Sequence, residues 1–273
     1  MNRSVRRCLF GVGAVTVVGA SAFGQGLAQA APSAPHVMAA VQTTAAAKPY
    51  VPPRKALYYG ETGAAVKSVQ RRLSQLHYYL GVADGSYGAN TLAAAWAFRE
   101  VQGLPMNATT GAQPIDRAFE KRLVHPVQPY VLIKHGPANR VEINLKHQVL
   151  VLYKNNKVTL ILHISSGGGY YFCNPPSGGG GCGYAVTPDG NFHAVYMIHG
   201  GDPVPLGYMY NPVFFDPAAG DAMHGGDPDP WYPASHGCVR LPEDVWNWFW
   251  TKLTIGGPHA TPVYLRGIAP YYL

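Results

Sequence analysis

Hydrophobic residues recur at helical spacing between residues 55 and 125. A repeat every three or four residues puts apolar side chains on one face of a helix, where they can pack into a core. Thr91 is placed to cap the second of these helices, which we expect to stop near Gly103. The pattern therefore predicts a small three-helix module. Its apolar positions are Val66, Val69, Leu73 and Leu76; Leu92, Ala95 and Trp96; and Ile115, Phe119 and Leu123.

From residue 141 the pattern changes to alternation of apolar and polar residues. It runs through residues 141–145, QVLVLY and residues 158–164, with turn signals between these segments. Such alternation is typical of strands that bury one face. We expect a mainly β domain over residues 141–268, an antiparallel sandwich or barrel-like fold. Within it Leu241–Leu253 alone looks helical, with a proline at its start and two acids in its first turn.

The N-terminus has the three parts of a secretory signal peptide. Three arginines precede an uncharged apolar stretch from Cys8 to Phe23, and Ala28-Gln29-Ala30 follows as an A-x-A cleavage site. We expect residues 1–30 to be removed. The alternative is an uncleaved membrane anchor, for which the many glycines and alanines make a weak span.

Two further segments read as connections between domains. Residues 31–54 are rich in alanine, proline and threonine, which is typical of a flexible linker. Residues 126–140 contain prolines and connect the helical module, residues 55–125, to the β domain.

Charge and composition narrow the class of protein. Only 13% of the 273 residues are charged, while 32 are glycine and 24 are proline, so we expect a globular fold rich in strands and loops. The net charge of +7 becomes +4 once three arginines are lost with the signal peptide. A mildly basic protein suits an anionic envelope polymer. No dense basic run or basic helix face points to nucleic acid.

Four cysteines become three when Cys8 leaves with the signal peptide. An odd number in an exported protein leaves one thiol unpaired. Cys173 and Cys182 bracket a Gly/Pro loop, and their closeness in an oxidising compartment favours a local disulfide. The remaining thiol is then Cys238, within the sequence SHGCVR.

The surroundings of Cys238 suit nucleophilic chemistry. Arg240 follows two residues later, and a helix N-terminus comes just after; both favour a thiolate. Gly237 permits a tight turn in which two amides can face one oxygen and stabilise an oxyanion. Nucleophile, nearby histidine and oxyanion donors describe acyl transfer through a thioester. A buried structural thiol is the alternative. Zinc is disfavoured because neither H-E-x-x-H nor a cysteine-pair spacing occurs.

Residues 60–104 resemble the peptidoglycan-binding type 1 module. The resemblance lies in a Gly-x-x-Gly-x-x-Val start, a Gln-x-x-Leu on the first helix, an Asp-Gly turn, and a Thr that opens the second helix. Arg99 departs from it, since the family usually has Gln after the Phe. The matching residues are Gly60, Gly63, Val66, Gln70, Leu73, Asp84, Gly85, Tyr87, Gly88, Thr91, Phe98, Gly103 and Leu104.

The stretch HGGDPDPWYPASHGCVRLPED resembles the catalytic motif of the YkuD-type L,D-transpeptidases. Two upstream segments, SSGGG and TPDGNF, are also similar, so the resemblance spans roughly residues 141–267. It implies a YkuD-type fold in which Cys238 is the nucleophile and His224 the base, held in its tautomer by a carbonyl such as that of Gly225. The amides of Gly237 and Cys238 would form the oxyanion hole.

Three further residues complete the site that the resemblance implies. Ser235, His236 and Arg240 would shape the pocket and its electrostatics, and Arg240 has the alternative role of anchoring the loop. The tetrapeptide His-Gly-Gly-Asp occurs at both His199 and His224. His199 is therefore the alternative base, and the family pattern favours His224.

The resemblance implies an exported enzyme that cross-links peptidoglycan. A thioester on Cys238 would form with release of D-alanine, and an amine of a second stem peptide would resolve it. The partners would be stem peptides and glycan outside the cytoplasmic membrane, with no cofactor, nucleic acid or stable membrane anchor. A carboxypeptidase or other cysteine hydrolase of the wall uses the same machinery with water. A non-catalytic wall-binding protein is the alternative of another class.

Overall fold

The computed structural model describes residues 50–78, 81–106, 111–174, 180–226 and 229–271. The expected signal peptide, residues 1–30, and most of the expected linker lie outside these ranges. Within them, no helix combines the length and the apolar character that crossing a membrane requires.

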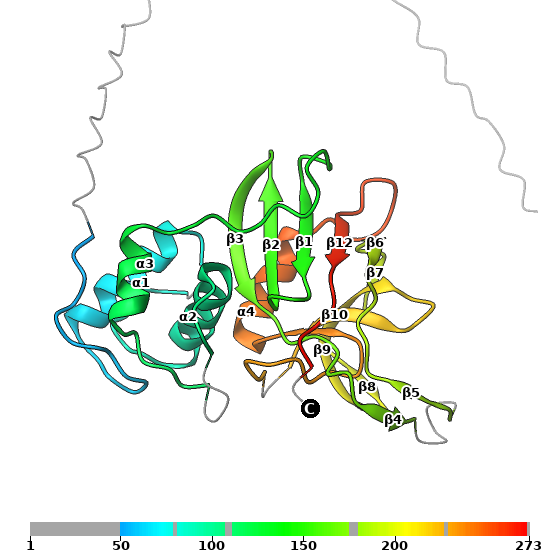
Figure 1. Ribbon diagram of the computed structural model, residues 1–273. Coiled ribbons are helices and arrows are strands. Elements are labelled where there is room, and N and C mark those ends of the chain that lie inside the picture. The colour runs from blue at the N-terminus through cyan, green and yellow to red at the C-terminus, as the bar shows by residue number, and fades with distance from the viewer. Residues whose placement is uncertain (1–49, 79–80, 107–110, 175–179, 227–228, 272–273) are drawn as a thin grey trace, which may run out of the picture. The chain divides into compact units, whose positions relative to one another are not determined.

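The helical module contains α1 (Ala64–Gln75), α2 (Ala89–Gln102) and α3 (Arg117–Val124), so the prediction of three helices is confirmed (Figure 1). Gly103 ends α2 in the left-handed conformation at φ 63°, which glycine adopts without a Cβ penalty. Asp116 caps α3 by accepting a hydrogen bond from the Phe119 amide at 2.9 Å. The apolar face of each helix enters a common core that includes Val69, Leu73, Phe98, Phe119 and Leu123.

The expectation that Thr91 caps α2 is wrong. The helix begins at Ala89 with Gly88 as its N-cap, and Thr91 is buried inside the first turn. The Thr91 hydroxyl accepts a hydrogen bond from Gln70 Nε2 at 2.9 Å and donates to the Ser86 carbonyl at 3.1 Å. The buried Gln70 also donates to Asp84 and accepts from the Gly85 amide. Thr91 thus belongs to a polar network that joins α1, the Asp-Gly turn and α2.

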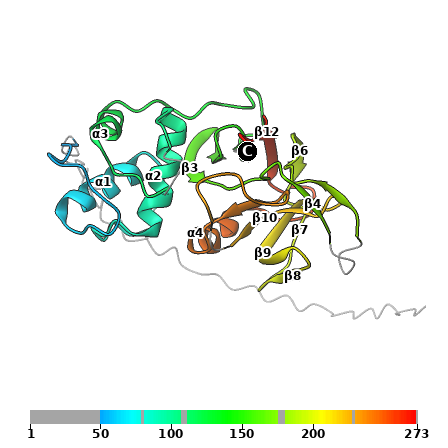
Figure 2. The same ribbon diagram turned by 60° about the horizontal axis from the view of Figure 1, so that its bottom comes forward.

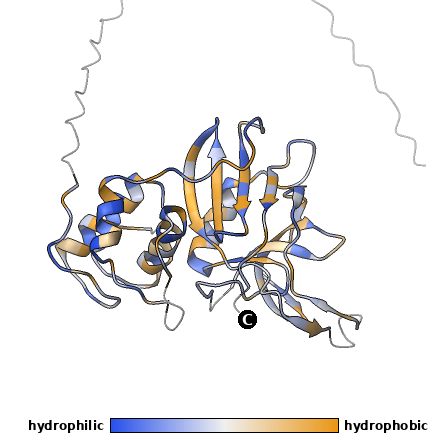
Figure 3. Ribbon diagram, viewed as in Figure 1, coloured by the Kyte–Doolittle hydropathy of each residue, from blue (hydrophilic) through white to orange (hydrophobic). Residues whose placement is uncertain are grey.

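The first sheet of the β domain has the order β3-β2-β1-β12-β6 (Figure 1). All its pairings are antiparallel except that of β1 with β12, which is parallel. In Figure 3 the strands β2 and β3 are mainly hydrophobic, whereas β1 alternates between hydrophilic and hydrophobic residues. The strands of this sheet are β1 (Arg140–Asn144), β2 (Val149–Lys154), β3 (Lys157–His163), β6 (Gly190–His193) and β12 (Pro262–Arg266).

A second sheet has the order β11-β10-β9-β7, with β8 paired to β9, and β4 and β5 form a separate hairpin. In Figure 2 the strands β7 to β10 form a group apart from β3 and β12. The strands are β4 (Tyr171–Cys173), β5 (Cys182–Tyr184), β7 (Tyr196–Met197), β8 (Asp202–Val204), β9 (Gly207–Asp216), β10 (Asp221–Gly225) and β11 (Val239–Leu241).

Mainly β architecture is as predicted, but two pairings depart from a purely antiparallel arrangement. β1 pairs with β12, and β10 pairs with β11, in parallel. A parallel pair needs a long connection between its strands, whereas a hairpin turn gives an antiparallel pair. Residue alternation is the same in both cases, so it cannot distinguish them.

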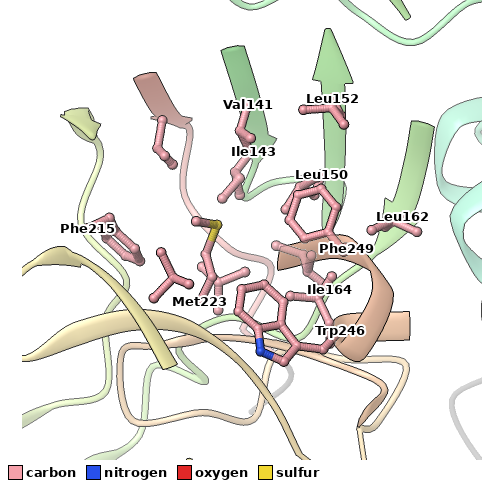
Figure 4. Close-up of a cluster of buried hydrophobic side chains, with 14 of the residues drawn as sticks. Val141, Ile143, Leu150, Leu152, Leu162, Ile164, Phe215, Met223, Trp246 and Phe249 are labelled. Atoms are coloured by element: carbon pink, nitrogen blue, oxygen red, sulfur yellow. The ribbon is translucent and has the colours of Figure 1, made fainter. Parts of the chain in front are cut away.

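The main core lies between the two sheets and α4 (Glu243–Phe249), which a short 3-10 helix, Trp250–Lys252, extends. The sequence pattern predicts this helix over Leu241–Leu253. In the structure Leu241 is the last residue of β11, and the helix begins at Glu243. Trp246 is fully buried, and its indole N–H donates to the Asn211 carbonyl at 2.9 Å. Figure 4 shows Trp246 and Phe249 facing the strand residues Val141, Ile143, Leu150, Leu152 and Met223.

The opposite face of the first sheet is also buried. Val149, Val151, Tyr153 and Ile161 belong to the same hydrophobic cluster as the helices. The Ile161 amide donates to the His77 carbonyl at 2.8 Å, just after α1. The helical module and the β domain therefore share one core across β2 and β3.

Candidate active site

The parallel pair β10 and β11 puts the candidate residues on one face. Met223 lies opposite Val239, and His224 lies opposite Arg240. Met223 and Val239 are fully buried in the main core. Successive side chains of a strand point to opposite faces, so His224 and Arg240 turn away from that core. Cys238 directly precedes β11, two residues before Arg240, and therefore opens to the same side.

A cleft of about 600 Å³ opens on this side, within the size range of ligand pockets. Its other walls come from the β8–β9 hairpin, including Met209 and Tyr208, and from the segment between Pro230 and Ala234. Five of the residues selected from the sequence line it together: His224, Ser235, His236, Cys238 and Arg240.

His224 is held as a neutral imidazole. Its Nδ1 lies 2.9 Å from the Gly225 carbonyl, which can only accept, so Nδ1 carries the proton and Nε2 has a free lone pair. This is the hydrogen bond expected from the sequence. Burial lowers the pKa of His224 to about 4, against the effect of that hydrogen bond and with help from the Arg240 charge. His224 is therefore neutral at pH 7, with its proton on Nδ1 and none on Nε2.

Cys238 has a free, half-buried thiol. Its Sγ lies 3.8 Å from Met209 Sδ and 3.9 Å from the Gly220 carbonyl. Burial raises the pKa of the thiol to about 12, and the Asp221 carboxylate adds to this, while the Arg240 charge lowers it. The resting site therefore holds a thiol and not a thiolate. A base must remove the proton as the sulfur attacks.

Two upstream motifs hold the backbone of the cysteine loop. Ser165, of the SSGGG segment, exchanges both backbone hydrogen bonds with Arg240, at 2.9 and 3.0 Å. The Gly167 amide donates to the Thr187 hydroxyl at 2.8 Å, and that hydroxyl donates to the Gly237 carbonyl at 2.5 Å. The SSGGG and TPDGNF motifs therefore support the loop that carries Cys238.

The amide expected in the oxyanion hole already has a partner. The Gly237 amide donates to Ser235 Oγ at 3.2 Å, and Ser235 Oγ donates to the Cys238 carbonyl at 2.5 Å. Ser235 thus closes the turn before the nucleophile. A carbonyl oxygen in the hole must share or displace this long hydrogen bond, so the role of Gly237 stays a proposal.

His236 is held by aromatic contacts. Its ring meets Tyr170 at 5.3 Å and Phe172 at 4.7 Å between centroids, both edge-on. Burial lowers the pKa of His236, with a further contribution from the Arg240 charge. Phe172 lies on the β4–β5 hairpin, which a disulfide between Cys173 and Cys182 closes. The cysteine pairing expected from the sequence is thus present, next to a residue that supports the cleft.

Arg240 combines both roles considered for it. Its backbone anchors the loop through Ser165, while its side chain lines the cleft. Within the described part of the chain, its Nε is buried without a hydrogen-bond partner. The Arg240 charge acts on the cleft residues, since it lowers the pKa of both Cys238 and His224.

The structure separates the two candidate bases. His199 does not line the cleft; its ring packs edge-on against Trp250 at 5.7 Å between centroids. The carbonyl that accepts from His224 belongs to Gly225. A Cβ on residue 225 would come within 3.0–3.2 Å of Trp246, so a larger side chain would be crowded at this position. Asp227, the last residue of the second His-Gly-Gly-Asp, lies outside the described residues.

Asp221 is a residue that the sequence reasoning missed. It lies on β10, and a Cβ on Gly237 would be only 2.5 Å from Asp221 Oδ1. Burial raises the pKa of Asp221 to about 6, and Asp216 contributes. Its only sequence signal is an acid in an otherwise apolar strand three residues before His224. The negative charge of Asp221 raises the pKa of Cys238 and so disfavours the thiolate.

Across the residues that the structure describes, no three or more His, Cys, Asp or Glu side chains gather in an arrangement that could hold a metal ion.

Two family models match the chain. The L,D-transpeptidase catalytic domain, YkuD, matches residues 138–265, and a peptidoglycan binding domain matches residues 62–113. Comparison with curated protein sequences found no match.

Solved structures are also similar. The L,D-transpeptidase from Xylanimonas cellulosilytica DSM 15894 is 32% identical, with a TM-score of 0.67; the match covers 78% of this chain and 100% of that one. The L,D-transpeptidase (Yku) from Stackebrandtia nassauensis is 18% identical, with a TM-score of 0.45, over 78% of this chain and 95% of that one.

The Asp221 charge predicts a measurable effect on the thiol. The rate of iodoacetamide alkylation of Cys238 should keep rising to pH 10 without a plateau, because the raised pKa keeps the sulfur protonated below that pH. Asp221→Asn removes a negative charge, so alkylation at pH 8 should become roughly threefold to tenfold faster. Glu61→Gln, at an exposed carboxylate of the helical module, is the control and should leave the rate unchanged. A plateau near pH 8.5 in the wild type, or equal rates in all three proteins, contradicts this account.

Proposed function

Because this chain belongs to the L,D-transpeptidase family, we propose that it cross-links peptidoglycan stem peptides through a thioester on Cys238. One observation carries the proposal. A protonated thiol at Cys238 and a neutral imidazole at His224, with Nε2 free, line the same cleft. This is the resting state of a nucleophile that its base activates only when a substrate is bound.

In the first half-reaction Cys238 Sγ attacks the carbonyl that precedes the terminal D-alanine of a tetrapeptide stem. The thiol proton passes to His224 Nε2, and a C–S bond forms. The C–N bond to D-alanine then breaks, and His224 returns the proton to the leaving amine. The Cys238 amide and the Gly237 amide, released from Ser235, stabilise the oxyanion between these steps.

In the second half-reaction the side-chain amine of a diamino acid on a neighbouring stem attacks the thioester. His224 takes the amine proton, the C–S bond breaks, and the thiol recovers its proton. The product is a direct cross-link between two diamino-acid residues. Arg240 supports both halves, because its charge favours the developing thiolate.

We further propose that the protein works outside the cytoplasmic membrane. The support is the signal-peptide pattern of residues 1–30, the disulfide Cys173–Cys182, and a family model for peptidoglycan binding over residues 62–113. The mature chain would comprise the linker 31–54, the helical module 55–125, the connector 126–140 and the catalytic domain 141–268. The glycan would bind the helical module.

Product analysis separates transfer from hydrolysis. Incubation with a disaccharide tetrapeptide carrying a diamino acid should give peptide-linked dimers and free D-alanine, resolved by liquid chromatography and mass spectrometry. Cys238→Ala should give neither. Tripeptide monomers without dimers would make the protein a carboxypeptidase instead.

The two candidate bases predict different kinetic losses. His224→Ala should lower kcat/KM for dimer formation by about 10²- to 10⁴-fold, the range for removing a general base. His199→Ala should change it by less than about threefold, because that ring packs on Trp250 outside the cleft. A larger loss at His199 than at His224 would reverse the assignment.

A further inference from the structure

We propose that His163 is a positioning residue for the acyl-transfer reaction, through which α2 of the helical module fixes the cleft wall between Asp229 and Ala234. The proposal rests on the proposed function and adds to it a role for the helical module. The module would be a structural part of the active site as well as a wall-binding element.

His163 lies at the end of β3 with its side chain completely buried. Its Nδ1 is 2.9 Å from Glu100 Oε1 on α2, and its Nε2 is 3.1 Å from the Pro230 carbonyl. The Pro230 carbonyl can only accept, so Nε2 is a donor. Burial raises the pKa of Glu100 to about 7, while the His163 charge and hydrogen bond lower it. Above that pH an ionised Glu100 also only accepts, so both ring nitrogens carry protons and His163 is a cation.

The surrounding charges support this state. Burial alone would lower the pKa of His163, but Glu100, its hydrogen bond, Asp229 and the Pro230 carbonyl together raise it to about 9. Two acids therefore face His163, Glu100 from α2 and Asp229 from the cleft wall. Trp96 of α2 covers the ring edge-on at 5.1 Å between centroids.

A second contact ties the same wall to the helical module. A Cβ on Gly111 would lie 2.3 Å from Trp231 Cδ1, so the Trp231 ring covers this glycine. Gly111 has φ +64°, and its carbonyl accepts the Trp96 indole N–H at 2.6 Å. Trp96 therefore contributes to both contacts, one through His163 and one through Gly111.

The wall leads directly to the nucleophile. Pro230, Tyr232 and Ala234 line the cleft, followed by Ser235 and Cys238. At its other end the wall is held by Ser165 Oγ, which donates to the Tyr232 carbonyl at 2.8 Å. These two contacts hold the wall at Pro230 and Tyr232, and a stem peptide bound in the cleft would lie against it.

A buried ion pair contributes little to the free energy of unfolding, because the cost of desolvating both charges offsets their attraction. Apolar side chains of similar volume often stabilise a fold equally well. The geometry of an ion pair is better suited to fixing one arrangement. His163 selects the single position of Pro230 at which Nε2 can donate. We therefore expect the loss of the His163 side chain to slow the reaction of large substrates more than that of small reagents.

The test compares His163→Gln with His259→Gln, a change at an exposed histidine, in the full mature chain. Thermal unfolding by circular dichroism checks that each variant is folded at the assay temperature. His163→Gln should raise KM for the disaccharide tetrapeptide and lower kcat/KM by at least about tenfold, since a small misplacement of a substrate is costly. Alkylation of Cys238 by iodoacetamide should stay within about twofold of the wild type. This small reagent reaches the sulfur without being positioned by the cleft wall.

Glu100→Gln provides a second variant that keeps a hydrogen-bond acceptor for Nδ1 and removes only the charge. It should lower kcat/KM less than His163→Gln does, and the double variant should lose no more than His163→Gln alone, because both changes affect one contact. Unchanged kinetics in both single variants, additive losses, or an equal fall in alkylation and turnover would overturn the proposal. Failure of the wild type to form any cross-link would instead overturn the proposed function.

Discussion

The parallel pairing of β10 with β11 is the constraint on which the site depends. Its register sends Met223 and Val239 into the core and turns His224 and Arg240 toward the cleft. Burial penalises a charge on either Cys238 or His224. It therefore raises the pKa of the thiol and lowers the pKa of the imidazole. The thiol stays protonated and the imidazole stays neutral, which is the pair of states that a proton transfer during attack requires. A free thiol kept neutral is also protected from oxidation, because the thiolate is the reactive form.

Around this strand pair, the loop that carries Cys238 has few ways to move. Ser165 and Thr187 bond its backbone from one side, and Phe172 packs on His236 from another. The wall before Ser235 is held by His163. The first sheet brings these supports together, since β3 packs against the helical module, carries His163 and leads directly to Ser165. The helical module and the catalytic chemistry are thereby linked through one sheet.

Local pattern was enough to predict the three helices of the module and the strands β1 to β3, and the resemblance to a family motif gave the five residues that line the cleft. Each depends on spacing or on a motif within a short stretch. The parallel pairs, the burial of Thr91 with Gln70, and the acids that face Cys238 and His163 were not predictable in this way. They depend on partners 14 to 122 residues away, as for Gln70 with Asp84 and Val141 with Val263. Alternation says which face a residue takes and nothing about which strand lies beside it.

The central claim is that Cys238 is the acylated nucleophile. Intact-protein mass spectrometry after incubation with a carbapenem, followed by peptide mapping, tests it directly, because opening of the β-lactam ring by a thiolate loses no atoms. The account predicts one adduct of the full carbapenem mass, on the peptide that contains Cys238, and none on Cys238→Ala. No adduct on the wild type, or an equal adduct on Cys238→Ala, would contradict it.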